Sequence, residues 1–187
     1  MTLRITAGAW RGRRIEAAPA IRPTQERVRE ALLASWTPRL AGARMLDLFA
    51  GSGAVGLEAL SRGASWCGFV ESDEACLRVL AANAAALGVA RDVIARLELP
   101  GGLARLPRAW PPAYDLVFAD PPYGFDAHCA LLAAIAPRLA PGGEVAIEHS
   151  SRRSLAGAGS DAGLEVDRER RYGESALTFL LRRTEQP

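Results

Sequence analysis

Residues 46–56 read LDLFAGSGAVG, an apolar run that leads into a glycine-rich stretch. We expect a short buried strand over Arg44–Phe49 and a helix over Ala54–Arg62. Between the two, the glycines of a G-x-G-x-x-G pattern are Gly51, Gly53 and Gly56. Glycines at this spacing allow a ligand to approach the backbone and the amino end of the helix. The stretch therefore predicts the first strand, loop and helix of a ligand-binding α/β sheet, with a simple tight turn as the alternative.

Strand and helix patterns alternate along the chain after this stretch. Further strands are expected at Trp66–Val70, Val93–Leu99, Tyr114–Ala119 and Glu144–Glu148, and further helices at Glu74–Leu87, Gly102–Leu106 and Ala127–Leu139. This alternation predicts a mainly parallel sheet that helices cover on both faces. The last two strands, Leu164–Tyr172 and Ala176–Arg182, have no helix between them and predict a hairpin. Ala156–Gly163 is expected to be a surface loop.

An arm and a helix are expected ahead of the sheet. Leu3–Ile15 is expected to form an irregular or β-ribbon arm, and Thr24 can cap the helix that follows it. We therefore divide the chain into a basic N-terminal arm and helix, residues 1–43, and a sheet domain, residues 44–187.

The net charge of the chain is small but unevenly distributed. The formal net charge is +2, yet residues 1–44 contain nine arginines and three glutamates, a balance of +6. The remaining residues contain 14 arginines and 18 acids, a balance of −4. A basic arm on a mildly acidic body favours an anionic partner that the arm holds, with a merely solvated surface as the alternative.

The composition argues against several classes of protein. The chain has 187 residues, 49% of them hydrophobic, which suits one compact globular domain. No apolar run approaches the roughly 20 residues of a membrane span, and the N-terminus lacks the apolar segment of a secretory signal. The cysteines form no C-x-x-C pair and the two histidines lack metal-ligand spacing. We therefore expect a cytoplasmic protein with no metal site.

Two acids indicate which ligand the glycine loop holds. Glu71 ends the second strand, where an acid can bind ribose hydroxyls, and this position fits NAD and adenosyl ligands equally. Asp47 lies before the glycines at the carboxyl end of the first strand. A carboxylate there would repel a pyrophosphate but attract a sulfonium or ammonium group. The pair of acids therefore predicts S-adenosylmethionine.

Residues 117–124, VFADPPYG, end the fourth strand in an acid and two prolines. Two prolines prevent the strand from continuing, and the fourth strand of a doubly wound sheet lies beside the first. Asp120 then faces the crevice at the carboxyl ends of the strands, where Asp47 also lies. There its carboxylate and the Pro121 carbonyl can accept both hydrogens of an exocyclic base amine. Tyr123 can stack on a base taken out of its helix. The candidate catalytic residues are Asp120, Pro121, Pro122 and Tyr123, with a capped strand end as the alternative reading of the turn.

The chain resembles class I S-adenosylmethionine-dependent methyltransferases with an Asp-Pro-Pro-Tyr motif, and more narrowly the RsmD family. The matching stretches are RITAGAWRGRRI, RPTQERVREALLASW, LDLFAGSGAVGLEALSRGA, VESD, YDLVFADPPY and RRYGESALTFL. The resemblance implies a Rossmann-like seven-stranded sheet with an antiparallel last strand. It also implies methylation of N2 of one guanine in small-subunit (16S) ribosomal RNA by a monomeric cytoplasmic enzyme that acts on assembled or assembling 30S particles.

The candidate binding residues form two groups. The cofactor-binding candidates are Asp47, Phe49, Ala50, Gly51, Ser52, Gly53, Glu71, Ser72 and Glu98. The RNA-binding candidates are Arg4, Trp10, Arg11, Arg13, Arg14, Arg22, Thr24 and Arg27. The family usually carries an Asp after the third strand that contacts the adenine, but this chain has Leu97 near that place and Glu98 one step on. Either Glu98 replaces the Asp, or the backbone holds the adenine.

Three other functions are compared with this one. The Asp-Pro-Pro-Tyr motif also occurs in adenine-N6 methyltransferases of DNA or RNA, but 187 residues leave little room for a dedicated duplex-recognition domain. A non-catalytic RNA-binding assembly factor has no need of the intact stretch 120–123. An NAD oxidoreductase is disfavoured by Asp47 and by the C-terminal hairpin.

Overall fold

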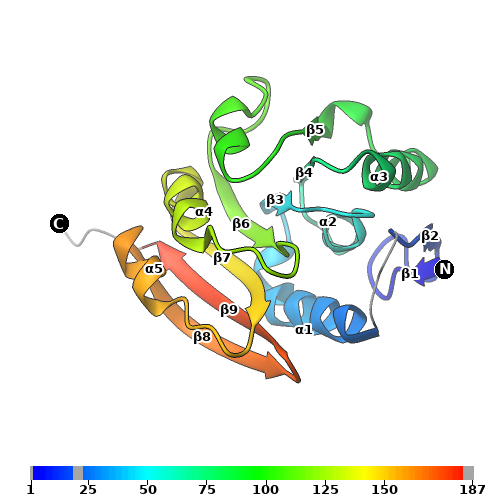
Figure 1. Cartoon of the computed structure of the whole chain (residues 1–187). Coiled ribbons are helices and arrows are strands. Elements are labelled where there is room, and N and C mark those ends of the chain that lie inside the picture. The colour runs from blue at the N-terminus through cyan, green and yellow to red at the C-terminus, as the bar shows by residue number, and fades with distance from the viewer. Residues whose placement is uncertain (1, 19–22, 183–187) are drawn as a thin grey trace.

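Within residues 2–18 and 23–182, which the computed structural model describes, a seven-stranded sheet runs through the centre of the molecule (Figure 1). Its strands lie in the order β5-β4-β3-β6-β7-β9-β8. They are β3 (Arg44–Leu48), β4 (Trp66–Glu71), β5 (Ile94–Arg96), β6 (Tyr114–Ala119), β7 (Leu139–Ser150), β8 (Leu164–Tyr172) and β9 (Ser175–Arg182). Strands β3 to β7 pair in parallel, and β9 runs antiparallel to both of its neighbours. The predicted sheet is therefore confirmed.

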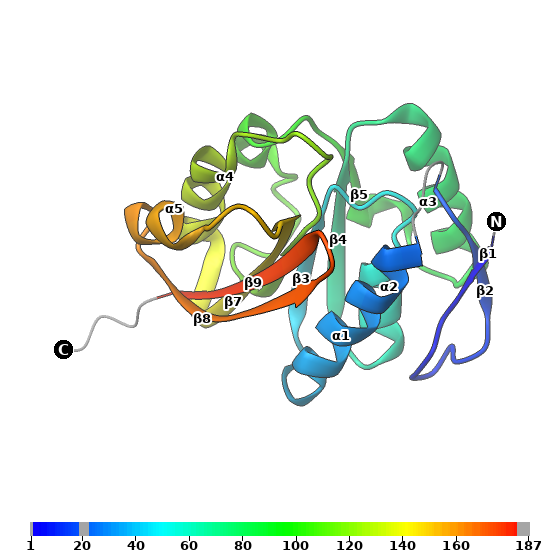
Figure 2. The ribbon, with the colours of Figure 1, turned by 60° about the horizontal axis from the view of Figure 1, so that its bottom comes forward.

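Helices cover both faces of this sheet (Figure 2). On one face lie α1 (Pro23–Leu40), α2 (Ala54–Ser61) and α3 (Glu74–Ala86), and on the other lie α4 (His128–Ile135) and α5 (Ala156–Asp161). Short 3-10 helices occupy Arg91–Val93 (η1), Gly101–Arg105 (η2) and Ala136–Arg138 (η3). Each face of the sheet has its own hydrophobic core: the first lies under α1, α2 and α3, and the second under α4 and α5. Because side chains alternate along a strand, Leu116 and Phe118 of β6 pack in the first core, and Val117 and Ala119 in the second. The apolar runs of the sequence are thus buried on both sides.

Helices α2 and α3 begin where the sequence predicts. Gly53 precedes α2 with a φ of +77°, and Asp73 caps α3 by accepting a hydrogen bond of 2.8 Å from the Cys76 amide. Gly88 follows α3, again with a φ of +77°. Both helices therefore start at the carboxyl edge of the sheet, beside the loops that follow β3 and β4.

Helix α1 is anchored to the C-terminal hairpin by one buried acid. Glu144, at 1% exposure, accepts hydrogen bonds from the Trp36 indole (3.1 Å), from Arg39 (2.5 Å) and from Arg168 (2.7 Å). The Trp36 ring also meets Phe179 of β9 edge-on, with 6.3 Å between the ring centroids. Residues on both sides of position 43 thus share one core, and the division of the chain at this position stays a prediction about function.

The N-terminal arm, expected to be either irregular or a β-ribbon, is a β-ribbon. Strands β1 (Thr2–Arg4) and β2 (Arg14–Glu16) pair antiparallel, and the ribbon lies against α2 and α3 (Figure 1). Asn83 of α3 accepts a hydrogen bond from the Glu16 amide (2.8 Å) and donates one to the Glu16 carbonyl (2.9 Å). The second strand of the arm is therefore attached to the helical layer of the first face.

Two expectations about helices are wrong. The segment expected to be a loop contains α5, because Gly159 packs so closely on β9 that an added Cβ would lie 2.4 Å from the Leu180 side chain. Helix α1 begins at Pro23, so Thr24 lies inside the helix and not at its cap. Proline suits the first position of a helix, since its fixed φ is helical and its missing N–H is unneeded there.

Two strands also differ from their expected bounds. The third predicted strand, Val93–Leu99, is reduced to β5, because η1 occupies the residues up to Val93 and the chain turns toward η2 after Arg96. Strand β7 begins at Leu139, the last residue of the predicted helix Ala127–Leu139, and it includes Pro141 and Gly142 ahead of the predicted strand Glu144–Glu148. Its register against β6 shifts before Glu144, so the proline and glycine lie in an irregular section. No helix among the residues described is long and apolar enough to cross a membrane.

Replacement of Gly56 by Ala should destabilise the fold. An added Cβ would lie 2.5 Å from Phe69 Cε1 and 2.6 Å from Cys67 Sγ, so α2 would have to move away from β4. Overpacking of this kind costs about 1–3 kcal/mol, and we expect the free energy of unfolding to fall by that amount. Urea unfolding measures the loss, with Gly157→Ala in α5 as the matched control, because nothing lies within 4 Å of its added Cβ. Equal stability of the two variants would refute the prediction.

Candidate active site

A cavity of about 550 Å³ opens at the carboxyl edge of the sheet, where β3, β4, β6 and β7 end. Of the described residues that line it, seven are acidic: Glu26, Asp47, Glu71, Asp73, Glu98, Asp120 and Glu148. Among the same residues Arg29 alone is basic. The cavity is therefore strongly negative, and it suits a ligand that carries positive charge.

The glycine loop forms one wall of the cavity. Phe49, Ala50, Gly51 and Ser52 line it. Phe49 has a φ of +58°, a left-handed conformation that is rare for a bulky side chain. Its ring packs edge-on against Phe125, with 5.4 Å between the centroids, and this packing holds the turn. Gly53 does not line the cavity, but an added Cβ there would lie 2.3 Å from the Leu80 side chain, so it shapes the loop.

Asp47 is buried at the base of the cavity, at 1% exposure. One of its oxygens accepts a hydrogen bond of 2.9 Å from the Gly56 amide. Burial raises the pKa of its carboxyl to about 8, the Gly56 hydrogen bond opposes this shift, and the negative charges of Asp120 and Glu71 add to it. A cation in the cavity would favour the ionised form, so Asp47 is poised to respond to a positively charged ligand.

Glu71 is oriented by three backbone amides. Its carboxylate accepts hydrogen bonds from Gly51 (2.8 Å), Ser72 (2.7 Å) and Asp73 (2.9 Å). A carboxylate has about four acceptor positions, so these three bonds leave one for a hydroxyl group. The arrangement fits the predicted contact with a ribose, and it fixes the position of the side chain beforehand.

The structure places Leu97 and Glu98, the two residues near the position of the family's Asp, differently. Leu97 packs against the second core and its amide donates to the Glu71 carbonyl (3.1 Å). Glu98, the next residue, lines the cavity together with Leu99. Glu98 is therefore the side chain that can replace the usual Asp, and its contact with adenine stays a prediction.

The Asp-Pro-Pro turn, residues 120–122, lies at the same cavity as Asp47 and Glu71. Asp120 and Pro122 line it, whereas Pro121 and Tyr123 are not among its lining residues. The Pro122 carbonyl accepts a hydrogen bond of 2.9 Å from the Phe125 amide, which closes the turn after the prolines. Tyr123 is 83% exposed and so lies at the surface, outside the cavity lining.

The candidate RNA-binding residues whose side chains the structure describes are not among those that line the cavity. Arg4, Arg11, Arg13, Arg14 and Arg27 are exposed. Arg13 nevertheless donates a hydrogen bond to the Ala86 carbonyl at the end of α3, and so has a structural contact. Trp10 is half-buried, and its amide donates to Ser61 Oγ (2.9 Å). Arg22 lies outside the described residues, and the side chain of Thr24 outside the described side chains.

Several residues of the cavity were missed by sequence reasoning. Glu148 lies near the end of β7, beside Asp120, which follows β6, because Ala119 pairs with Ile147. Its place at the end of the predicted strand Glu144–Glu148 was a usable signal. Leu3 and Ala18 of the arm, and Glu26 and Arg29 of α1, also line the cavity. They reach it only through the packing of the arm and α1, which no local pattern indicates. No group of three potential metal ligands occurs in the part of the chain that the structure describes.

Known proteins resemble this chain along nearly its whole length. A family model described as Conserved hypothetical protein 95 matches residues 3–181. The chain is 41% identical over 123 residues to Ribosomal RNA small subunit methyltransferase D of Escherichia coli (strain K12). This match covers 65% of this chain and 60% of that protein, less than two thirds of that protein's length. The chain is 30% identical over 186 residues to Putative rRNA methyltransferase YlbH of Bacillus subtilis, and this match covers 97% of this chain and 100% of that protein. The solved structure titled Putative methyltransferase yhhF from Escherichia coli superimposes with a TM-score of 0.80 at 30% identity, covering 99% of this chain and 100% of that one.

Asp47→Asn should change how stability depends on pH. The pKa of Asp47 is about 8 in the fold and near 3.8 in the unfolded chain, so the folded protein holds one extra proton between these values. Stability then falls as pH rises through this window, by up to about 1.4 kcal/mol per pH unit. Asparagine keeps the acceptor for the Gly56 amide but does not ionise, so the variant should lack this fall.

Urea unfolding at about pH 5.5 and about pH 7.5 compares the two proteins within the window. Asp115→Asn serves as the control, because its hydrogen bonds with Arg44 lower the pKa of Asp115 and place its effect at more acidic pH. The same loss of stability in wild type and Asp47→Asn would show that Asp47 does not titrate in this range.

Proposed function

The chain belongs to the family described as Conserved hypothetical protein 95, and we propose that it transfers a methyl group from S-adenosylmethionine to the N2 amine of a guanine in small-subunit (16S) ribosomal RNA. The observation that carries this proposal is that Asp120 lines the same cavity as Asp47 and Glu71. Groups suited to a cationic adenosyl ligand and a group suited to a base amine thus converge, as transfer between the two requires. The names of the Escherichia coli and Bacillus subtilis relatives support it.

The residues of the cavity fit S-adenosylmethionine. Its volume of about 550 Å³ falls in the range of roughly 300–1,000 Å³ that small-molecule sites occupy. Glu71 retains an acceptor position for a ribose hydroxyl, and buried Asp47 can ionise beside a cation. When bound, the cofactor supplies an electrophilic methyl group on its sulfonium. Asp47, the glycine loop, Glu71, Ser72 and Glu98 are the residues that we assign to holding it.

Asp120 and the Pro121 carbonyl would prepare the amine. The lone pair of an exocyclic base amine is delocalised into the ring, so the amine is a poor nucleophile. Acceptors for both of its hydrogens localise that lone pair and direct it toward the methyl group, an interaction that matters most in the transition state. The exposed ring of Tyr123 offers a stacking surface for the base at the rim of the cavity.

The basic arm would hold the RNA. Its exposed arginines lie on the ribbon and on the first turns of α1, apart from the cavity lining. Arginine forms forked contacts with phosphates, which position an RNA without selecting a sequence. We propose that the substrate is ribosomal RNA in an assembled or assembling 30S particle, and that the protein works as a cytoplasmic monomer.

Methyl transfer should depend on Asp120. The purified protein is incubated with labelled S-adenosylmethionine and naked 16S ribosomal RNA, 30S subunits or DNA, and the modified nucleoside is identified by mass spectrometry. We expect N2-methylguanosine from an RNA substrate. Asp120→Ala should abolish transfer, while the dissociation constant for S-adenosylhomocysteine stays near the wild-type value, because this carboxylate serves the amine and not the cofactor.

Three outcomes would contradict parts of the proposal. Activity of Asp120→Ala within about tenfold of wild type, or about 1.4 kcal/mol, would remove the carboxylate from the mechanism. N6-methyladenosine as the product would instead establish an adenine methyltransferase. Cofactor binding without transfer to any of the three substrates would favour a non-catalytic assembly factor.

Loss of two arm arginines should weaken RNA binding and flatten its salt dependence. Arg11→Ala combined with Arg14→Ala spares Arg13, whose bond to Ala86 attaches the arm. Each lost phosphate contact should reduce the slope of log affinity against log salt by about 0.7–0.9, because fewer counterions are released. Cofactor affinity should be unchanged.

A charge-matched control replaces Arg91 and Arg108, two exposed arginines that precede β5 and β6 and so lie toward the edge opposite the cavity. RNA affinity is measured against salt concentration for all three proteins. Parallel plots for wild type and the arm variant would exclude phosphate binding by the arm.

A further inference from the structure

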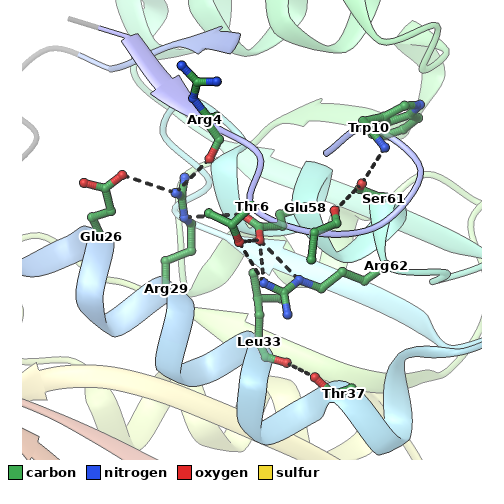
Figure 3. Close-up of polar contacts among 11 residues, drawn as sticks. Arg4, Thr6, Trp10, Glu26, Arg29, Leu33, Thr37, Glu58, Ser61 and Arg62 are labelled. Carbon is green, nitrogen blue, oxygen red and sulfur yellow. Dashed lines mark hydrogen bonds and ion pairs between the residues drawn. The ribbon is translucent and has the colours of Figure 1, made fainter. Parts of the chain in front are cut away.

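Arg29 is a buried cation in the wall of an otherwise acidic cavity. It lies on α1 and is 4% exposed, and it is the basic member of the described lining residues, against seven acids. Figure 3 shows its guanidinium between the β1 strand and α2. None of the roles assigned above to the cavity uses this residue, so its positive charge requires its own explanation.

The guanidinium is held from the side of the arm and α2. Its Nη2 donates to the Arg4 carbonyl of β1 (3.2 Å), and it pairs with Glu58 (3.6 Å) and Glu26 (3.7 Å) (Figure 3). Its Nε is buried without a hydrogen bond among the residues described. These contacts fix the position of Arg29 before any ligand arrives.

Glu58 alone does not account for the charge of Arg29. Glu58 is fully buried, and it already pairs with Arg62 at 2.6 Å and accepts a hydrogen bond from Thr6. Two arginines therefore meet one buried carboxylate, and Glu26 is too exposed, at 45%, to balance the second one well. The charge of Arg29 is thus compensated by one shared buried carboxylate and one exposed carboxylate, and the guanidinium can still attract an anionic group of a ligand at the cavity wall.

We propose that Arg29 binds the carboxylate of the methionine half of S-adenosylmethionine, an inference that rests on the proposed function. The cofactor carries two cationic groups, the sulfonium and the ammonium, and one anionic group, the carboxylate. The acids of the cavity suit the first two, and Arg29 is the described lining residue that suits the third. A guanidinium presents paired donors that match a carboxylate, and such charged hydrogen bonds are strong.

The placement of the walls agrees with this assignment. Glu71 ends β4 and Glu98 follows β5, and they are assigned to the ribose and adenine. Arg29 enters from α1, together with Leu3 of β1, on a different part of the lining. Asp47 is the penultimate residue of β3, and β3 lies between β4, which ends in Glu71, and β6, which Asp120 follows. The amino-acid end of the cofactor is thereby assigned to the wall that the arm and α1 build.

Decarboxylated S-adenosylmethionine tests the proposal, because it lacks only the carboxylate and keeps both cationic groups. Isothermal titration calorimetry of the full chain should show that wild type binds S-adenosylmethionine about 10- to 100-fold more tightly than the decarboxylated form, the factor expected for a hydrogen bond between charged groups. Arg29→Met should lose this preference, through weaker binding of S-adenosylmethionine, while its affinity for the decarboxylated form is kept or increased. Arg29→Lys, which keeps the charge but not the fork, should retain part of the preference.

Arg62→Met is the matched control. Arg62 pairs with the same Glu58 but does not line the cavity, so its loss disturbs the same junction without touching the ligand. This variant should keep the wild-type preference. Equal affinity of wild type for the two ligands, or an unchanged preference in Arg29→Met, would overturn the role of Arg29. Where Arg29→Met does not fold, Arg29→Lys tests the residue, and an undiminished preference in that variant would overturn the role of the guanidinium fork. A wild type that binds neither ligand would overturn the proposed function itself.

Discussion

The buried carboxylate of Glu58 is the point at which the arm, α1 and α2 are joined. An ionised group at 0% exposure is tolerated only with charged or hydrogen-bonding partners, and removal of one partner of a buried pair costs several kcal/mol. The partners of Glu58 come from three segments: Thr6 from the arm, Arg29 from α1 and Arg62 from the end of α2. Stretches far apart in the sequence are thereby held in one arrangement (Figure 3). The wall of the cavity that the arm and α1 build depends on this junction.

The opposite wall depends on backbone geometry. The carboxyl ends of β3, β4 and β6 meet at one edge, and their terminal acids are brought together before any ligand binds. The amides around Glu71 fix its carboxylate, and burial keeps Asp47 poised between its two protonation states. The left-handed Phe49 stores strain that its contact with Phe125 helps to sustain. Such preorganisation suits a transfer reaction in which the protein mainly positions two partners.

The sheet and its cavity-facing acids could be predicted because each has a local signal. Apolar runs marked β3 and β6, and the parallel topology then placed Asp120 beside Asp47 without any knowledge of side-chain contacts. Arg29, Leu3 and Ala18 could not be found in this way, because they reach the cavity through the packing of the arm and α1 on α2 and α3. Helix α5 escaped prediction for a similar reason. Its glycines disfavour a helix, and the burial of Gly159 against β9 overrides that preference.

The two binding surfaces that we propose share one side chain. Arg29 holds the Arg4 carbonyl of β1 and also lines the cavity, so the position of the arm and that of the cavity wall are not independent. Arg29 thus connects the ribbon to the site that we assign to the cofactor's carboxylate, and any effect of one ligand on the binding of the other would pass through this contact. Such linkage is reciprocal by thermodynamic necessity: whatever factor the cofactor contributes to RNA affinity, RNA contributes to cofactor affinity. The buried junction at Glu58 joins the arm, α1 and α2, and it is the physical route that such a coupling would take.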